Sequence, residues 1–219
     1  MEPKEKIAPI LKALTKAYPR SHTALNYKTP LEILIATILS AQCTDKRVNE
    51  VTVGLFKKYP NAKAYAEASL EDLEADIRPT GFYHNKARSI QRCCRDLVNT
   101  YNGEVPRTLE ELVKLPGIGR KTANVVLGSA FGIPGIVVDT HVGRIVQRLG
   151  LTAETDPVKI EFVLMPLIPL GKWILFSHQL IDHGRSLCTA RAPKCPVCFL
   201  LPYCDFGQSR HTSSGDRRA

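Results

Sequence analysis

Apolar residues recur along most of this chain at the spacing of amphipathic helices, and hardly any stretch alternates as a strand does. A nearly continuous apolar run follows Thr29-Pro30, a pair that suits the start of a helix, and extends to Ser40. The pattern therefore predicts an all-α protein. Among the predicted helices, the later ones cover roughly residues 120–131, 139–149, 156–165 and 172–185.

One predicted helix, from about His84 to Tyr101, has two contrasting faces. Apolar side chains fill one of them at helical spacing. The opposite face is basic and has Lys86 nearby; its members are Arg88, Arg92 and Arg95. This face either is simply solvated or contacts phosphate, and the sequence leaves both interpretations open.

The composition narrows the kind of protein and its partners. The 219 residues have a formal net charge of +9 and a pI near 9.3. Such a charge indicates a polyanionic partner, most often nucleic acid, with a merely basic surface as the alternative. The first residues lack the apolar region of a secretion signal, and the longest apolar stretch, Leu31 to Leu39, is too short to span a bilayer. We therefore expect an intracellular protein of the cytoplasm or nucleoid, with no membrane partner.

Cysteines are concentrated near the C-terminus in a C-x6-C-x2-C-x5-C run. Because the run has few apolar residues and contains three prolines, a metal centre would order it better than packing would. Thiolate tetrads bind zinc or an iron–sulfur cluster, and the uneven gaps favour a cluster, since zinc sites usually show two short pairs. A disulfide fits a reducing compartment less well. The run consists of Cys188, Cys195, Cys198 and Cys204, whereas Cys43, Cys93 and Cys94 are interpreted as packing residues.

A glycine-rich segment, Leu115 to Ala123, separates two helical patterns. Pro116 ends the first helix, while Gly117 and Gly119 permit positive φ and let another molecule approach the backbone closely. The next helix then begins with free N–H groups, which form an anion site. The segment therefore predicts contact with a DNA phosphate without readout of a base. A plain connection between two helices is the alternative.

These features together resemble a known family. The segment LPGIGRKTANVV resembles the helix-hairpin-helix of the DNA glycosylase superfamily, and Val138-Asp139-Thr140-His141 resembles its catalytic segment. With the cysteine run added, the match is to the endonuclease III family, whose members are bifunctional DNA glycosylases and AP (apurinic or apyrimidinic site) lyases. The three features lie in the family's order and spacing, and the resemblance extends over roughly residues 5–206.

The resemblance implies an all-α fold of two helical lobes with a cleft between them. One lobe, residues 23–135, would be a six-helix barrel that carries the helix-hairpin-helix. The other, residues 1–22 and 136–206, would hold the iron–sulfur cluster. The remaining residues, 207–219, are rich in Ser, Arg and Gly, so we expect a disordered tail there.

The resemblance also implies the reaction, which is base-excision repair by removal of oxidised or damaged pyrimidines from duplex DNA, followed by β-elimination. Lys121 falls on the family's nucleophile and Asp139 on its catalytic carboxylate. An amine suits this chemistry, because it attacks the sugar C1′ and then forms the Schiff base from which β-elimination proceeds. From the residues alone, Lys121 could also be a solvated or phosphate-binding lysine. Asp139 could be the N-cap of the following helix, alone or in addition to its catalytic role.

Several further residues are expected to contact DNA. By resemblance, Gln42 and Phe82 lie on loops that enter the duplex when the damaged nucleotide is extruded, although Phe82 could instead be a core aromatic. Gly117 and Gly119 would face a phosphate. His141 would either contact DNA or pack internally.

The cysteine run adds two cations to this interface. Arg191 and Lys194 lie in the gap between Cys188 and Cys195. A bound 4Fe–4S cluster, with zinc as the alternative, would hold that gap as a rigid loop and present both cations to the DNA backbone. The cluster would then have a mechanical role, remote from the chemistry.

We expect a monomer whose partner is double-stranded DNA containing damaged bases or abasic sites. Two rival interpretations stand beside this one. An adenine-mispair glycosylase carries a similar cluster, but Lys121 and the short chain argue against it. A non-catalytic DNA-binding module would use the hairpin and the cluster for structure alone.

Overall fold

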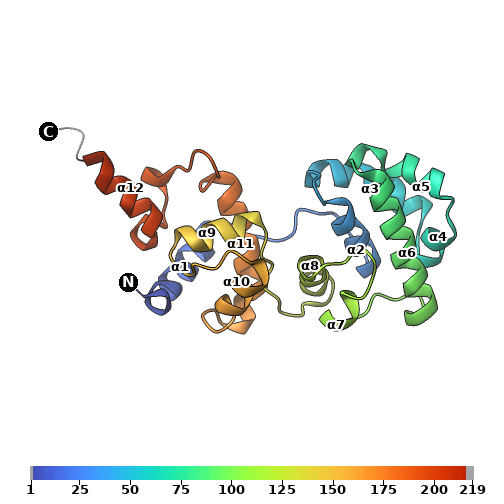
Figure 1. The fold of residues 1–219 in the computed structure, drawn as a ribbon, viewed down its shortest axis with the longest axis horizontal. Helices are drawn as coiled ribbons and strands as arrows, with labels where there is room; N and C mark the ends of the chain where they lie inside the picture. The colour runs from blue at the N-terminus through green and yellow to red at the C-terminus, as the bar shows by residue number, and fades with distance from the viewer. Residues whose placement is uncertain (1, 216–219) are drawn as a thin grey trace. The chain divides into compact units, whose positions relative to one another are not determined.

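The computed structural model describes residues 2–215, with side chains up to Arg210, and it consists of helices and loops (Figure 1). Over these residues there is no strand, so the predicted all-α class is confirmed. The chain divides into two compact units, each described by itself. One unit is continuous, Thr23–Ile133, and the other joins Met1–His22 to Pro134–Ala219.

The continuous unit is built around α2, whose residues from Ile33 to Leu39 are all buried. Its core also takes Leu97 of α6 and Val126 of α8, together with the buried thiols Cys93 and Cys94. Burial raises the pKa of the Cys93 thiol to about 12, which suits a packing residue. The helices of this unit are α2 (Pro30–Leu39), α3 (Asp45–Lys58), α4 (Ala62–Glu67), α5 (Leu70–Ile77), the short η1 (Arg78–Thr80), α6 (Tyr83–Tyr101), α7 (Leu109–Leu112) and α8 (Arg120–Phe131).

Side-chain caps explain where many of these helices begin. Thr29 Oγ1 accepts a hydrogen bond from the backbone N–H of Glu32 at 3.1 Å, and Pro30 fills the first helical position. The same three-residue offset recurs at the starts of α3, α4, α5 and α7. The capping residues there are Thr44, Asn61, Ser69 and Thr108.

The second unit has its own apolar core, in which Phe176 and Leu180 of α11 are fully buried. Its N-terminal helix is fixed by Lys6, which is 3% exposed and donates hydrogen bonds to the carbonyl oxygen of Leu149 and to Asp205. The helices are α1 (Pro3–Ala17), α9 (Thr140–Arg148), α10 (Pro157–Leu164), η2 (Leu170–Lys172), α11 (Trp173–Ser186), η3 (Cys195–Val197), η4 (Leu201–Tyr203) and α12 (Asp205–Gly215).

The C-terminal segment differs from its prediction. Residues 207–215 belong to α12 and are not a disordered tail, while residues 216–219 lie outside the described part of the chain. Local contacts explain this start of a helix: the Gly207 N–H points at Cys204 Sγ, and Gln208 donates to the carbonyl oxygen of Pro202. No helix in the described part of the chain is long and apolar enough to cross a membrane.

Candidate functional site

The hairpin between α7 and α8 uses its two glycines differently. Gly117 has φ +79°, the left-handed conformation that a glycine permits. Gly119 has φ −89° and serves as the N-cap of α8, so it does not use the positive φ that its residue type permits. Ile118 between them is 5% exposed and anchors the turn in the core.

Gly117 packs closely against α6. A Cβ at this position would lie 2.8 Å from the Cβ of Ser89, closer than two carbon atoms can approach. No atom lies within 4 Å of the position that a Cβ of Gly119 would take, and Gly119 is exposed. One glycine therefore sets the packing of the hairpin, and the other leaves its backbone open to an approaching group.

An open hollow of about 210 Å³ brings together three residues predicted to contact DNA: Gln42, Phe82 and Gly117. They come from three segments, namely the loop after α2, the turn before α6 and the hairpin. The remaining lining residues are Ile38, Ala41, Asn85, Lys86 and Ser89.

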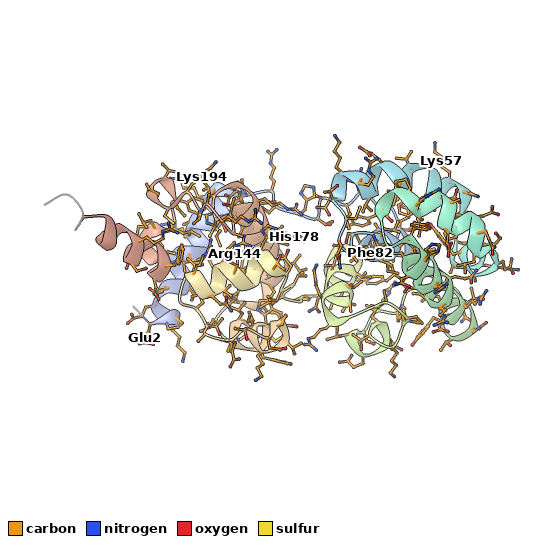
Figure 2. The ribbon with its side chains drawn as sticks, turned by 45° about the horizontal axis from the view of Figure 1, so that its top comes forward. Glu2, Lys57, Phe82, Arg144, His178 and Lys194 are labelled. Atoms are coloured by element: carbon orange, nitrogen blue, oxygen red, sulfur yellow. The ribbon has the colours of Figure 1, made fainter. Side chains whose placement is uncertain are left out.

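Both residues predicted to enter the duplex have unusual backbones. Gln42 has φ +52° and Phe82 has φ +49°, a region that side-chain-bearing residues seldom adopt and that a bulky aromatic adopts at a cost. The Phe82 side chain, labelled in Figure 2, is 63% exposed. The interpretation of Phe82 as a core aromatic is therefore wrong, and the fold keeps this large apolar ring in solvent.

Lys121 is the second residue of α8 and its side chain is exposed. The first turn of a helix carries free N–H groups and the positive end of the helix dipole. The Lys121 side chain therefore lies at the N-terminus of α8, which would also attract an anionic group of a substrate.

Asp139, in the other unit, is the N-cap of α9. Its Oδ1 accepts hydrogen bonds from the backbone N–H groups of His141 and Val142, both at 2.8 Å. Both bonds use the same oxygen, so Oδ2 takes no part in the cap. The predicted capping role is confirmed, and the cap fixes the orientation of the carboxylate.

His141 packs within its own unit. Its Nδ1 lies 3.1 Å from Nη2 of Arg144, and a Cβ at Gly184 of α11 would collide with the ring. Burial lowers the pKa of His141, and the neighbouring Asp139 carboxylate opposes this effect. Of the two interpretations left open by the sequence, the half-buried ring favours internal packing.

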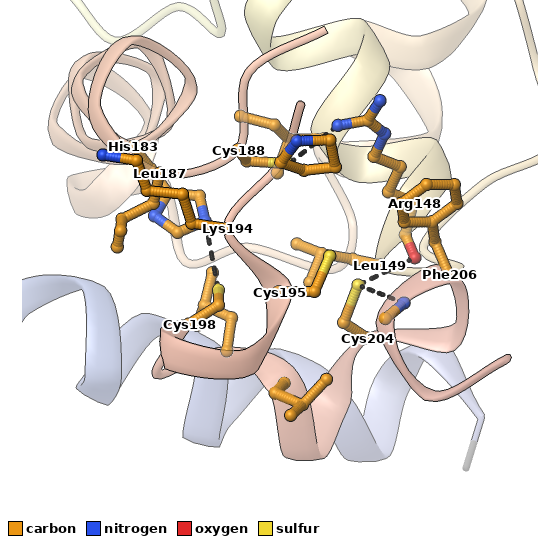
Figure 3. Close-up of a pocket in the computed structure, with 15 residues that line it drawn as sticks. Arg148, Leu149, His183, Leu187, Cys188, Lys194, Cys195, Cys198, Cys204 and Phe206 are labelled. Atoms are coloured by element: carbon orange, nitrogen blue, oxygen red, sulfur yellow. Dashed lines mark hydrogen bonds between the residues drawn. The ribbon is translucent and has the colours of Figure 1, made fainter. Parts of the chain in front are cut away.

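The four cysteines of the run line one small cavity of about 20 Å³ (Figure 3). All four are free thiols. Within the described residues, no three His, Cys, Asp or Glu side chains are placed to bind a single metal ion. The thiols thus line a volume and do not converge on one point.

Hydrogen-bond donors are directed at the cysteine sulfurs. Nη1 of Arg148 donates to Cys188 Sγ at 3.2 Å, and the Gly207 N–H donates to Cys204 Sγ at 3.3 Å (Figure 3). Burial raises the pKa of the Cys198 and Cys204 thiols. A guanidinium and a backbone N–H beside these half-buried sulfurs suit thiolate ligands, since both donors stabilise negative charge there.

The loop after Cys188 is fixed by the same arginine. Arg148 donates to the carbonyl oxygens of Thr189 at 2.8 Å and Ala190 at 2.9 Å. The exposed residues Arg191 and Lys194 follow directly in this loop. Lys194 is labelled in Figure 2, and it also lines the cysteine cavity.

The sequence did not reveal the structural roles of two residues, Lys86 and Arg148, which form hydrogen bonds within these sites. Lys86, placed near a basic surface by the sequence, is 5% exposed, whereas Arg88, Arg92 and Arg95 are exposed as expected. Arg148 reads in the sequence as an ordinary basic residue in the last turn of a helix. Nothing local to either residue indicates its partners.

The chain is similar to known proteins over most of its length. The model of the HhH-GPD superfamily of base excision DNA repair proteins matches residues 35–169. Endonuclease III of Synechocystis sp. is 52% identical over 207 residues, which are 94% of each protein. A structure of a non-covalent endonuclease III–DNA complex has a TM-score of 0.92 and 48% identity, with 97% of this chain and 100% of that chain covered.

A second solved structure, a trapped endonuclease III–DNA covalent intermediate, also has a TM-score of 0.92 and 48% identity, covering 96% of this chain and 100% of that chain. These matches extend over nearly the whole sequence, including the hairpin and the cysteine run, and they confirm the resemblance. The chain therefore belongs to the HhH-GPD superfamily of base excision DNA repair proteins and, within it, to the endonuclease III family.

Proposed function

We propose that this chain is a DNA glycosylase and AP lyase that removes oxidised or damaged pyrimidines from duplex DNA. Membership of a base-excision repair family supports the enzyme class. The observation that carries the proposal furthest is the hollow shared by Gln42, Phe82 and Gly117. It joins two strained, exposed loops to a phosphate-binding hairpin, as an enzyme that extrudes a nucleotide needs.

Lys121 is the proposed nucleophile. Its Nζ would bond to the sugar C1′ while the bond from C1′ to the base breaks, and the base leaves with the bonding electrons. The C1′–O4′ bond then breaks, O4′ takes its electrons and a proton from the nitrogen, and an iminium forms. The iminium acidifies the 2′ hydrogen, whose loss expels the 3′ phosphate. Asp139, held by the α9 cap, would accept a proton from the Lys121 ammonium, which leaves the neutral amine as the nucleophile, and it would support positive charge on the sugar.

Gln42 and Phe82 are the proposed inserting residues. Phe82 would wedge between base steps, and Gln42 would hydrogen-bond the base left without a partner. The left-handed backbone at both positions supports this proposal, because strain of this kind persists mainly where function requires it.

A 4Fe–4S cluster is the proposed resident group of the cysteine cavity. Four half-buried thiols around one cavity, with N–H donors directed at two of the sulfurs, fit such a cluster. When bound, the cluster would cross-link the segment from Cys188 to Cys204 and keep its loop rigid. Arg191 and Lys194 would then contact DNA phosphates, a role that their exposure and the net charge of +9 support. The protein would act as a monomer.

Borohydride trapping tests the enzyme directly. Duplex DNA with one abasic site is incubated with the protein in the presence of borohydride, which reduces a Schiff base to a stable cross-link. We expect a protein–DNA adduct with the native chain and none with Lys121→Gln. Lys114→Gln, an exposed lysine on the other side of the hairpin, is the matched control and should still be trapped. Absence of an adduct with the native chain would favour a non-catalytic DNA-binding module.

A further inference from the structure

Lys86 is a buried lysine that the proposed reaction does not use. It lies in the first turns of α6 and is 5% exposed. Its Nζ donates a hydrogen bond of 2.8 Å to the carbonyl oxygen of Leu39 and another of 2.8 Å to that of Thr80. An ammonium in this position is unavailable to a phosphate on the surface.

The two carbonyl groups end the segments that lead into the inserting loops. Leu39 is the last residue of α2, and Gln42 follows three positions later. Thr80 is the last residue of η1, and Phe82 follows two positions later. The single ammonium therefore joins the bases of both loops, although Leu39 and Lys86 are 47 residues apart in the chain.

The hydrogen bonds from the Lys86 ammonium to the two carbonyl oxygens are well suited to hold these segments in place. Carbonyl oxygens at a helix C-terminus lack partners within the helix, and a cation there also interacts favourably with the helix dipole. Burial lowers the pKa of Lys86, so the ammonium depends on these acceptors for its charge. An apolar replacement would leave two carbonyl oxygens without this donor.

We propose that Lys86 is a positioning residue that fixes the Gln42 and Phe82 loops relative to each other, so that both can enter the duplex together. Lys86 also lines the hollow that contains both of these residues. The inference rests on the proposed function, since it requires that the two loops enter DNA. It assigns Lys86 no contact with the substrate.

The test separates insertion from chemistry by using two substrates. In the first, an abasic site lies opposite 2-aminopurine in a duplex, and the fluorescence of 2-aminopurine reports its unstacking. In the second, the abasic nucleotide is a bulge without an opposite base, so little insertion is needed. Lys86→Met should lower single-turnover Schiff-base formation on the duplex by on the order of tenfold to a hundredfold, as misplacement of groups by an ångström does. It should also lower the 2-aminopurine signal of the duplex, and the loss of rate should be largely absent on the bulge.

The matched control is Lys63→Met, which makes the same change at an exposed site and should alter neither substrate. Lys86→Arg, which retains charge and donors, should recover part of the loss. Should Lys86→Met fail to fold, Lys86→Gln, which keeps an uncharged N–H donor group, is measured in the same way. Equal losses on duplex and bulge would overturn the inference, because they indicate general damage to the fold.

A double-mutant comparison gives a second criterion. If Lys86 acts through the Phe82 loop, Lys86→Met should have little further effect on the duplex rate once Phe82→Ala is present. Full additivity would contradict this. Failure of the loop insertion and failure of the enzyme activity are distinguishable. If the native protein is trapped by borohydride but Gln42→Ala and Phe82→Ala leave the fluorescence unchanged, the proposed insertion is wrong and the proposed lyase activity stands. If the native protein is not trapped, the proposed lyase activity itself is wrong.

Discussion

Arg148 contacts two of the four cysteines that line the cavity, and its bond to Cys188 is the more informative. Nη1 of the arginine lies 3.2 Å from Cys188 Sγ, and the same guanidinium binds the carbonyl oxygens of Thr189 and Ala190. The backbone oxygen of Arg148 lies 3.2 Å from Cys204 Sγ. One side chain of α9 thus connects a proposed metal ligand to the loop that carries Arg191.

Arg148→Met should therefore weaken both the cluster and the loop. Three hydrogen bonds from a charged donor are lost, and we expect a destabilisation of about 2–4 kcal/mol. The measurement is the loss of visible absorbance with time in the presence of an iron chelator, which should be faster than in the native protein. Arg191→Met, in the same loop but exposed, is the control and should keep the native rate. Equal rates for native protein and Arg148→Met would show that this arginine does not support the cluster.

The two hairpin glycines should respond differently to alanine. Gly117→Ala places a Cβ against Ser89 and forces a left-handed alanine, which costs about 1–2 kcal/mol from the backbone alone. Gly119→Ala meets no atom and should change the free energy of unfolding by less than about 0.5 kcal/mol. Its methyl group should still weaken DNA binding, because it stands where a phosphate approaches the backbone. Urea unfolding and DNA titration of both variants give the comparison.

Adding Ser89→Gly to Gly117→Ala tests whether the contact with Ser89 causes the loss of stability. This second change removes the Cβ that the new methyl group meets, so part of the lost stability should return while the backbone cost remains. No recovery at all would mean that the close approach of the hairpin to α6 is not what limits the substitution.

Local patterns were enough to predict most of the helices. The start of α2 follows from Thr29-Pro30, and α8 covers residues 120–131 as its apolar spacing predicts. These elements depend on neighbours within a few residues, so the sequence contains the information directly. The same holds for the Asp139 cap, which bonds to residues two and three positions away.

Contacts across the fold were beyond such reasoning. Lys86 reaches Leu39 over 47 residues, and Arg148 reaches Cys188 over 40. In the sequence both residues look like surface cations. Their partners are backbone carbonyl oxygens and, for Arg148, a thiol, and only the tertiary fold brings these groups close to them. Gly117 and Gly119 show a related limit, because residue type permits positive φ but the path of the turn decides which glycine adopts it.

Two substitutions at Asp139 separate its role as a helix cap from the catalytic role of its charge. Asp139→Asn keeps a side-chain oxygen that can accept from His141 and Val142, so stability should change little. Asp139→Ala loses the cap as well and should cost about 1 kcal/mol. Both should lower single-turnover base release by on the order of 10²–10⁴-fold, as expected for loss of a catalytic carboxylate. Retained base release in Asp139→Asn would show that the cap is the only role of this residue.

Charge reversal in the cysteine loop tests the DNA contact. Lys194→Glu should weaken DNA binding and reduce the slope of log affinity against log salt by about 1, the effect of losing one phosphate contact. The visible absorbance of the cluster should be unchanged, because Lys194, although it also lines the cysteine cavity, is exposed and is not one of the four proposed ligands. Lys63→Glu, an exposed lysine of α4, provides the control for total charge. Identical salt slopes for the two variants would count against a specific contact by Lys194.

His178 should make the stability of its unit depend on pH. Burial lowers the pKa of this histidine; the cations of His22 and Arg185 act in the same direction, and Asp182 and Asp139 oppose it. The unfolded chain binds a proton at about pH 6.5, whereas the folded chain binds it only at lower pH, so acid favours unfolding.

Below about pH 6.5, the free energy of unfolding should therefore fall, with at most about 1.4 kcal/mol per pH unit for each such proton. Burial also lowers the pKa of His141 and His183, so the native slope includes more than one group. His178→Gln should accordingly reduce the slope without abolishing it. Urea unfolding followed by the fluorescence of Trp173, the single tryptophan, reports on the same helix. Parallel pH profiles for native protein and His178→Gln would mean that His178 is protonated equally in the folded and unfolded chain.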